Sequence, residues 1–309
     1  MYRLKLVPSE TAFKFIRYRT FAYAFSGAMV IASIALFFAN GLNYGIDFRG
    51  GTMIEIGTEG PADIGDIRSR LAALNLGDVQ VQEFGEPTDV LIRVEQQGET
   101  AESDQNVVEK IKAELGDGVE YRRVEVVGPK VSAELVEAGT LAVVIAVLLM
   151  LVYIWFRFEW QFSVGAVLAL VHDVVLTIGI FSVLQLEFNL SIIAAILTIV
   201  GYSMNDTVVV YDRIREKLRK YKKMDLGDLL DLAINKTLSR TVMTSVTTLL
   251  ALASLYIFGG EVIRGFTFAM MWGVVVGTYS SIFVAAPLLL ILGVKRDWSE
   301  TGTSSTATP

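Results

Sequence analysis

The residues that could carry chemistry in this chain are charged side chains inside segments otherwise apolar enough to span a membrane. Asp206 interrupts the run SIIAAILTIVGYSMNDTVVVY, ahead of the first basic residue, Arg213. Arg240 opens a second such run, RTVMTSVTTLL. A charge within a bilayer costs several kcal/mol and usually faces a bundle interior or a water path. The pattern therefore predicts a buried carboxylate at Asp206, with Arg240 as its candidate cationic partner.

Such a pair could act as a proton switch. With the guanidinium of Arg240 close, Asp206 stays ionised, and with Arg240 withdrawn it takes up a proton. If the two states open to opposite sides of the membrane, proton flow is converted into motion. One charge that crosses about 100 mV releases roughly 2.3 kcal/mol, enough to bias a conformational equilibrium about fiftyfold. The alternative is a static buried ion pair that holds two helices together.

A second candidate for proton transfer lies in the third apolar segment. Its sequence LVHDVVLT contains Asp173 and the single histidine of the chain, His172. Ionisable groups in a membrane favour a bundle interior or a water path, which gives both residues a possible functional role. The alternative role is to orient the neighbouring helices.

Small and polar residues near these candidates are predicted to support helix packing. Gly201 lets a neighbouring helix approach closely, and Asn205 on the same face can hydrogen-bond across that interface. Gly273 and Gly277 have the GxxxG spacing typical of close helix pairs. Thr244 belongs to a stripe of hydroxyl residues in the fifth apolar segment, which could line a polar path or bond back to the carbonyl groups of its own helix.

Six apolar blocks make this chain a polytopic membrane protein. Of its 309 residues, 53% are hydrophobic, and a helix that spans a bilayer needs roughly 20 apolar residues. The predicted spans cover residues 20–39, 139–156, 163–184, 190–211, 241–258 and 265–292. The first block follows several basic residues but is too long for the apolar region of a signal peptide, so we expect a retained helix. The absence of cysteine excludes disulfides.

The distribution of basic residues predicts the orientation, because Lys and Arg gather in the short segments on the cytoplasmic side. Both the segment before the first block and the segment RIREKLRKYKK are rich in these residues and should lie inside. The predicted layout is a cytoplasmic N-tail over 1–19, a first transmembrane helix over 20–39, an outside domain with linkers over 40–138, a five-helix transmembrane bundle over 139–292 with a basic cytoplasmic loop at 213–240, and a cytoplasmic tail over 293–309.

The outside region has the pattern of a small α+β domain. Alternating residues predict strands over 52–57, 78–84, 89–95 and 119–127, and helical spacing predicts helices over 61–74 and 103–115. The order βαββαβ is ferredoxin-like. The region lacks histidine, cysteine and a phosphate-binding loop, so we expect a binding or docking domain and no enzyme. Its excess of acidic residues argues against a nucleic-acid surface.

A glycine-rich motif, GIDFRGGT, leads into the first of these strands. It lacks the lysine of a nucleotide-binding loop, so an ATPase is not expected. We predict a tight turn in which Gly45, Gly50 and Gly51 supply conformations that other residues avoid. Asp47 and Arg49 are expected to pair locally, as a surface pair that contributes little to stability.

Five segments together resemble the SecF family, the membrane subunits of the SecDF protein-export complex, which is related to the resistance-nodulation-division transporters. These segments are GIDFRGGT, LVHDVVLT, GYSMNDTVVVYDRIRE, LSRTVMTSVTTLLALASLYIFGG and IRGFTFAMMWGVVVGTYSS. The resemblance runs from the first span to the sixth.

The resemblance implies a fold, a location and a function. The fold is a polytopic α-helical membrane protein with six transmembrane helices and one ferredoxin-like periplasmic domain between the first and second helices, in the bacterial inner membrane. The function is to complete preprotein export with the proton-motive force, without a cofactor or a metal. The implied partners are SecD, the SecYEG channel, YajC, YidC, the unfolded preprotein and membrane lipid, with no nucleic acid.

The resemblance also implies roles for individual residues. The family's buried aspartate falls on Asp206 within SMNDT, and its transmembrane arginine falls on Arg240 within LSRT. Asp173 is a further candidate. Because the chain carries only the SecF half, a complete proton path would require a separate SecD.

Two alternatives remain at this point. A small-molecule or lipid exporter of the same superfamily would need a second large outside domain between the third and fourth spans, where only residues 185–189 are found, or partner chains that form a funnel. A passive scaffold would hold the export machinery together without moving protons.

Overall fold

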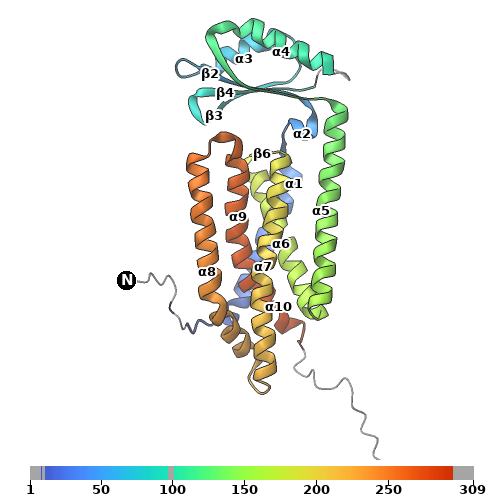
Figure 1. Ribbon diagram of the computed structural model, residues 1–309, viewed down its shortest axis with the longest axis vertical. Helices are drawn as coiled ribbons and strands as arrows, with labels where there is room; N and C mark the ends of the chain where they lie inside the picture. Colours follow the sequence, from blue (N-terminus) through green and yellow to red (C-terminus); the bar gives the residue numbers. More distant parts are fainter. Residues whose placement is uncertain (1–7, 9–10, 97–100, 295–309) are drawn as a thin grey trace, which may run out of the picture.

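The computed structural model describes residue 8, residues 11–96 and residues 101–294. Six long helices form a bundle, and a small sheet domain caps one end of it (Figure 1). Five spans are single helices: α1 (Arg19–Asn40), α5 (Pro129–Arg157), α6 (Trp160–Leu184), α7 (Leu190–Lys220) and α8 (Leu226–Phe258). The sixth is composite: η3 (Glu261–Ile263), α9 (Arg264–Ser280), the π-helix η4 (Ser281–Ala285) and α10 (Ala286–Ile291). The six predicted spans are therefore confirmed.

Several helices extend beyond the predicted apolar blocks. The expected loop over residues 213–240 is instead mostly helix, because α7 continues to Lys220 and α8 starts at Leu226. Its Glu, Lys, Arg and Leu residues are good helix formers, so propensity carries the helix past the end of the apolar run. Asp225 caps α8 by accepting a hydrogen bond from the backbone of Gly227 at 2.8 Å. The predicted C-terminal tail lies almost entirely outside the described residues.

The sheet domain has the predicted ferredoxin-like order. Its elements are β2 (Gly51–Thr58), α3 (Ile64–Ala72), β3 (Val79–Phe84), β4 (Glu86–Val94), α4 (Ala101–Leu115), the short η2 (Gly116–Gly118) and β5 (Val119–Val127). The antiparallel strands lie in the order β3-β4-β2-β5. Alternate apolar residues such as Ile54 and Ile92 pack beneath α3 and α4 and form the core of the domain. The opposite face of the sheet faces the helix bundle and is mixed: charged residues such as Arg93 lie beside Met53 and Leu91, which form a small apolar cluster with Ile46.

A second, very small sheet joins the domain to the bundle. Strand β1 (Asn43–Tyr44) pairs in parallel with β6 (Glu187–Phe188), which lies in the link between α6 and α7. The one-turn helix α2 (Ile46–Arg49) follows β1 directly. The GIDFRGGT motif therefore lies at this junction.

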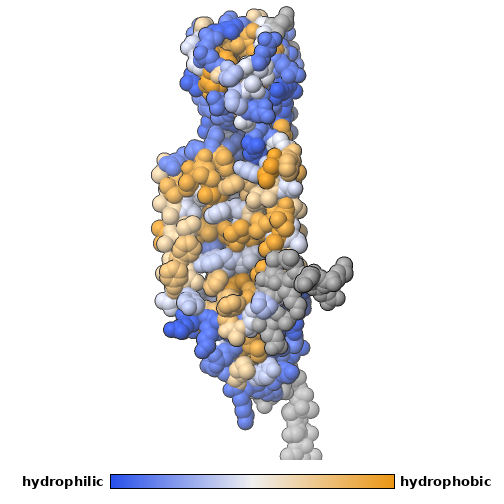
Figure 2. All heavy atoms as spheres, turned by 90° about the vertical axis from the view of Figure 1, so that its left-hand side faces the viewer, coloured by the Kyte–Doolittle hydropathy of each residue, from blue (hydrophilic) through white to orange (hydrophobic). Residues whose placement is uncertain are grey.

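The bundle has an inner and an outer set of helices. In α6, α7 and the sixth span, at least half of the most apolar stretch is buried within the bundle. In α1, α5 and α8, less than a fifth of that stretch is buried. On the face that contains α8, Figure 2 shows a broad hydrophobic belt between a hydrophilic sheet domain and a hydrophilic opposite end. This surface is that of a membrane protein, with polar residues at both ends of the belt and apolar residues between them.

Candidate functional site

Asp206 lies inside the bundle on α7, where hydroxyl groups from two other helices bind both of its carboxylate oxygens. Oδ1 accepts a hydrogen bond from the hydroxyl of Thr241 on α8 at 2.7 Å. Oδ2 accepts one from Ser281 at the start of η4 at 2.6 Å. The residue is 9% exposed. These bonds compensate in part for the loss of water around the carboxylate.

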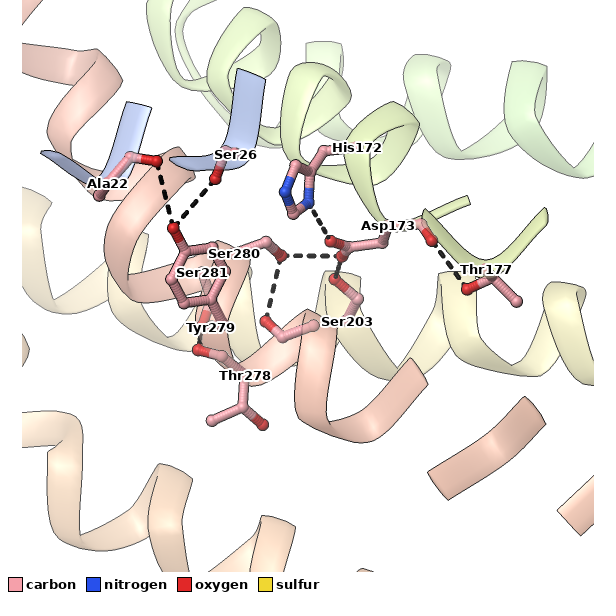
Figure 3. Close-up of polar contacts among 11 residues, drawn as sticks. Ala22, Ser26, His172, Asp173, Thr177, Ser203, Thr278, Tyr279, Ser280 and Ser281 are labelled. Atoms are coloured by element: carbon pink, nitrogen blue, oxygen red, sulfur yellow. Dashed lines mark hydrogen bonds and ion pairs between the residues drawn. The ribbon is translucent and has the colours of Figure 1, made fainter. Parts of the chain in front are cut away.

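Asp173 on α6 forms a second buried carboxylate site, and it is fully shielded from solvent. Its Oδ1 lies 2.9 Å from Nδ1 of His172. Its Oδ2 accepts hydrogen bonds from Ser203 on α7 at 2.5 Å and from Ser280 on α9 at 2.8 Å (Figure 3). The two predicted residues His172 and Asp173 are therefore in direct contact, and they tie α6 to α7 and α9.

Consecutive serines link the two carboxylates. Ser280 binds Asp173 and Ser281 binds Asp206, so one short segment of the sixth span contacts both acids. The π-helix η4 starts at Ser281, and π-bulges within α-helices often mark functional sites. Sequence reasoning missed these serines, although a hydroxyl pair within the apolar run TYSSIFVAA was the available signal.

The network extends to α1 through an aromatic residue. The ring of His172 stacks on that of Tyr279, with centroids 6.1 Å apart. The hydroxyl of Tyr279 lies 3.0 Å from that of Ser26 and donates to the backbone oxygen of Ala22. Four spans therefore contribute side chains to the group around Asp173, as Figure 3 shows.

Arg240 does not contact Asp206 in this conformation. Its side chain is exposed on α8, and among the residues that the structure describes, no carboxylate lies within the 4.0 Å that defines an ion pair with it. Arg240 is nevertheless close enough to act on Asp206 through its charge. Thr241, the next residue, occupies one carboxylate oxygen instead.

The predicted supporting residues on α7 and α8 lie at the bundle surface. Gly201 and Asn205 line an open groove of about 510 Å³ between α5 and α7. Asn205 is exposed there and makes no side-chain hydrogen bond to the described part of the chain. Thr244 is also exposed, and its hydroxyl bonds back to the carbonyl oxygen of Arg240 at 3.1 Å.

Gly273 and Gly277 bring α9 into close contact with α7. A Cβ atom at Gly273 would lie 2.3 Å from Ile199, and one at Gly277 would lie 2.9 Å from Ser203. Since real atoms do not approach so closely, only glycine fits at this helix spacing. The contact holds Ser203 and Ser280 on the same carboxylate, Asp173.

The GIDFRGGT motif differs from its expected local structure. The predicted pair between Asp47 and Arg49 is absent. Asp47 instead accepts a hydrogen bond from the backbone nitrogen of Leu190 at 2.9 Å, and the guanidinium of Arg49 lies over the ring of Tyr44. The reason is that the motif contains the helix α2, which turns Asp47 towards the start of α7. Gly50 and Gly51 have the expected left-handed φ values, +72° and +114°. The prediction is wrong for Gly45, which is extended with φ of −73°; there a Cβ would instead lie 2.6 Å from the side chain of Glu187.

A polar cavity of about 490 Å³ lies between the sheet domain and the bundle. Within it, the buried guanidinium of Arg93 on β4 pairs with Glu187 in the α6–α7 link. Burial raises the pKa of Glu187 above its ordinary value of 4.5, and Arg93 only partly opposes this effect. The nearby charge of Asp47 also raises the pKa of Glu187, and that of Arg123 lowers it.

The pKa of Glu187 predicts how the junction responds to pH. When the sheet domain contacts the α6–α7 link, the raised pKa makes Glu187 bind a proton more tightly than it does in water, so acid favours this contact. The stabilisation of the contact by protonated Glu187 is complete below about pH 4.5 and is lost as the pH rises through the raised pKa. We expect the amides of β1 and β6 to exchange hydrogen more slowly at pH 5 than at pH 8, after correction for intrinsic rates. The variant Glu187→Gln should lose this difference, whereas Glu125→Gln, whose partner Arg123 lies in the same domain, should keep it.

Hydroxyl groups surround both buried acids. Each carboxylate accepts hydrogen bonds from hydroxyl side chains, which can both donate and accept hydrogen bonds. In the described part of the chain, no group of three or more acidic, histidine or cysteine side chains is arranged to hold a metal ion.

Family models and relatives agree on the classification. The model for the C-terminal part of the protein export membrane protein SecD/SecF matches residues 107–295, and that of the SecD/SecF GG motif matches residues 35–62. The protein translocase subunit SecF of Rhodobacter capsulatus is 48% identical over 96% of this chain and 93% of its own length. That of Vibrio alginolyticus is 46% identical over 95% of this chain and 94% of its own.

Fused relatives contain a similar chain as one part. The protein translocase subunit SecDF of Brucella abortus is 46% identical over 97% of this chain, which spans only 40% of that protein. The crystal structure of SecDF from Thermus thermophilus, described as a translocon-associated membrane protein, aligns with a TM-score of 0.84 at 34% identity, over 94% of this chain and 40% of the solved one. A structure of SecDF in a super-membrane-facing form covers the same shares with a TM-score of 0.69 at 35% identity. The chain thus belongs to the SecD/SecF family of protein-export membrane proteins, as a multi-pass subunit of the SecF type.

Proposed function

We propose that this subunit works with a SecD partner in the bacterial inner membrane and uses the proton-motive force to promote the late stage of preprotein export through SecYEG. The observation that carries the proposal is the environment of Asp206. It is a carboxylate buried within a span, held by two hydroxyl groups, with an arginine nearby that is not bound to it.

The geometry supports a switch with two states. In the observed arrangement, Thr241 and Ser281 donate to the two oxygens of Asp206, and these bonds compensate in part for its burial. Arg240 precedes Thr241 on the same helix and points about 100° away from it around the helix axis. A rotation or shift of α8, together with a change of the long arginine side chain, would therefore exchange a hydroxyl for a guanidinium at the carboxylate. Arrival of a proton would remove the charge that attracts Arg240, and α8 could then return. Protonation and helix position are linked in this way because each alters the free energy of the other.

Exposed polar residues on the surface of the bundle favour the presence of a membrane-embedded partner beside this switch. Asn205 on α7 and Arg240, Thr244 and Thr247 on α8 are exposed at membrane depth. Polar groups there usually face protein or water rather than lipid. The fused relatives and solved structures carry a SecD part in the same chain. We infer that SecD covers this polar face and supplies the remainder of the proton path.

Charge at the bundle ends supports the proposed orientation. The end opposite the sheet domain carries Arg157 and the basic C-terminal part of α7, and Figure 2 shows that this end is hydrophilic. By the rule that basic residues remain inside, both chain termini lie in the cytoplasm and the sheet domain lies in the periplasm.

The sheet domain is proposed to contact the emerging preprotein, and YajC, YidC and membrane lipid are proposed as further partners. An unfolded segment should shift amide signals along one face of the sheet or along a groove. The absence of shifts at high peptide concentration would exclude direct contact. The link between α6 and α7 is too short to form a second outside domain, so a small-molecule exporter would depend on partner chains that form a funnel.

Arg240→Met tests the switch against a passive scaffold. Methionine preserves much of the side-chain volume but removes the charge. We expect the complex with SecD to assemble while the dependence of export on a proton gradient disappears, as measured in inverted membrane vesicles with and without a gradient. Arg240→Lys, which retains a cation, should keep part of the response. Full gradient dependence in Arg240→Met would exclude this arginine as the switching cation.

A further inference from the structure

The GIDFRGGT motif binds the sheet domain to the helix that carries Asp206. Strand β1 pairs with β6, which ends two residues before α7 begins. The backbone nitrogen of Gly45 donates to the oxygen of Phe188 at 2.9 Å. Asp47 Oδ2 accepts a hydrogen bond from the backbone nitrogen of Leu190, the first residue of α7, also at 2.9 Å. Main-chain and side-chain bonds therefore meet at the N-terminus of this helix.

The bond from Asp47 matches the electrostatics of a helix start. The first amide groups of a helix have no partner within the helix, and the N-terminus carries a partial positive charge. A carboxylate placed there satisfies one amide and lies favourably in the field of the helix. Asp47 performs this role from a distant part of the chain, whereas the side chain of the helix's own N-cap residue, Asn189, makes no capping hydrogen bond.

Arg93 connects the same link to the sheet. Its guanidinium pairs with Glu187 in β6 and also lies 3.5 Å from the side-chain oxygen of Asn43 in β1. Because Arg93 is only 8% exposed, this pair is screened by salt far less than a surface pair. The sheet, the motif and the α6–α7 link are consequently bound into one unit.

Helix α7 extends from this unit to the buried acid without interruption. Leu190 and Asp206 are separated along one helix by about 24 Å at 1.5 Å per residue. Gly273 and Gly277 pack α9 against α7 with no free space, so the two helices are expected to move together near Ser280 and Ser281. A displacement of α7 near Asp206 is therefore expected to move the start of α7, where Asp47 and strand β1 are bound.

We propose that Asp47 is a positioning residue that couples the orientation of the sheet domain to the protonation of Asp206 through α7. This inference rests on the proposed proton-driven function, and it adds the route by which the buried site acts on the domain outside the membrane. Asp47 belongs to neither hydrogen-bond network of the buried acids, so its removal leaves the switch itself intact.

The experiment measures domain orientation in the full chain, in complex with its SecD partner in nanodiscs. The chain has no native cysteine, so Lys110→Cys on α4 and Ile257→Cys on α8 provide two unique sites for spin labels. Pulsed electron paramagnetic resonance then gives the distance between the sheet domain and the bundle. Asp206→Asn represents the protonated acid and is combined with each variant of Asp47.

With Asp47 present, Asp206→Asn should shift the mean distance by about 2–5 Å, the range of known helix shifts. Adding Asp47→Ala should reduce this shift to less than half. Asp47→Asn should restore it, because asparagine also accepts hydrogen bonds at helix starts. Ser191→Ala should have no effect, because the hydroxyl of Ser191, in the first turn of α7, bonds to the adjacent Asn189 and, within the described residues, to no group of the sheet domain.

Two results would overturn the proposal. An undiminished shift in Asp47→Ala would show that the domain responds by another route. No shift with Asp47 present would show that no signal reaches the domain. Gradient-dependent export of Asp206→Asn, measured separately, reports on the proposed function, so a failure of the coupling is distinguishable from a failure of the proton site.

Discussion

Asp206→Asn is expected to abolish the part of late-stage export that depends on a proton gradient. Asparagine preserves the shape of the side chain. Its oxygen can accept a hydrogen bond from one of the hydroxyls of Thr241 and Ser281 and its NH2 group can donate to the other, but it cannot release a proton. A charge that crosses about 100 mV biases an equilibrium by roughly fiftyfold, so the loss of gradient-driven acceleration should be large. The measurement compares late-stage export in inverted vesicles with and without a gradient.

The matched control is Asp212→Asn on the same helix. Asp212 lies at the bundle end and pairs with Arg157 at 2.7 Å, in a partly exposed position. Exposed pairs contribute little to stability, and this carboxylate is not part of the buried network. Normal acceleration by the gradient in Asp206→Asn would exclude it as the proton site, whereas an equal loss in both variants would indicate a general effect of charge.

Gly273→Ala is expected to disturb strongly the packing of α9 against α7. The added Cβ would lie 2.3 Å from Ile199, so α9 must move away from α7. Overpacking of this kind costs about 1–3 kcal/mol. The displacement would also withdraw Ser280 and Ser281 from the two acids. We expect lower thermal stability of the complex together with a reduced response to the gradient.

Gly265→Ala on the same helix provides the control for this substitution. Its new Cβ would lie 3.6 Å from Ile192, which is an ordinary contact distance. Thermal unfolding of the two variants is monitored by the loss of the complex with SecD. The comparison distinguishes the effect of close packing at Gly273 from the effect of alanine on helix propensity. Equal thermal stability of the two variants would show that α7 and α9 can move apart without destabilising the complex.

The elements of the fold were predictable because their signals are local. Apolar runs and alternating strands revealed all six spans and the βαββαβ domain. Helix boundaries were less accurate, because residues 213–240 are polar and were assigned to a loop. Helix propensity and the Asp225 cap, rather than hydrophobicity, determine the structure there.

The polar site was predictable only in part. Asp206, Asp173 and His172 stood out because ionisable residues are rare in apolar spans, and the structure places all three in the bundle interior. Ser280 and Ser281 did not, since isolated hydroxyl groups are common in membrane helices and their partners lie far away in the sequence. The bond between Asp47 and Leu190 joins residues 143 positions apart, so local pairing with Arg49 was the simpler expectation.

The central claim is that the carboxyl group of Asp206 gains and loses a proton while it is shielded from bulk water. Isotope-edited infrared difference spectroscopy of the reconstituted complex tests it most directly, with the Asp206 band assigned by its loss in Asp206→Asn. The account predicts that a protonated-carboxyl band and a carboxylate band of Asp206 exchange intensity when a gradient is applied during export. A band that stays in one form under every condition would contradict it.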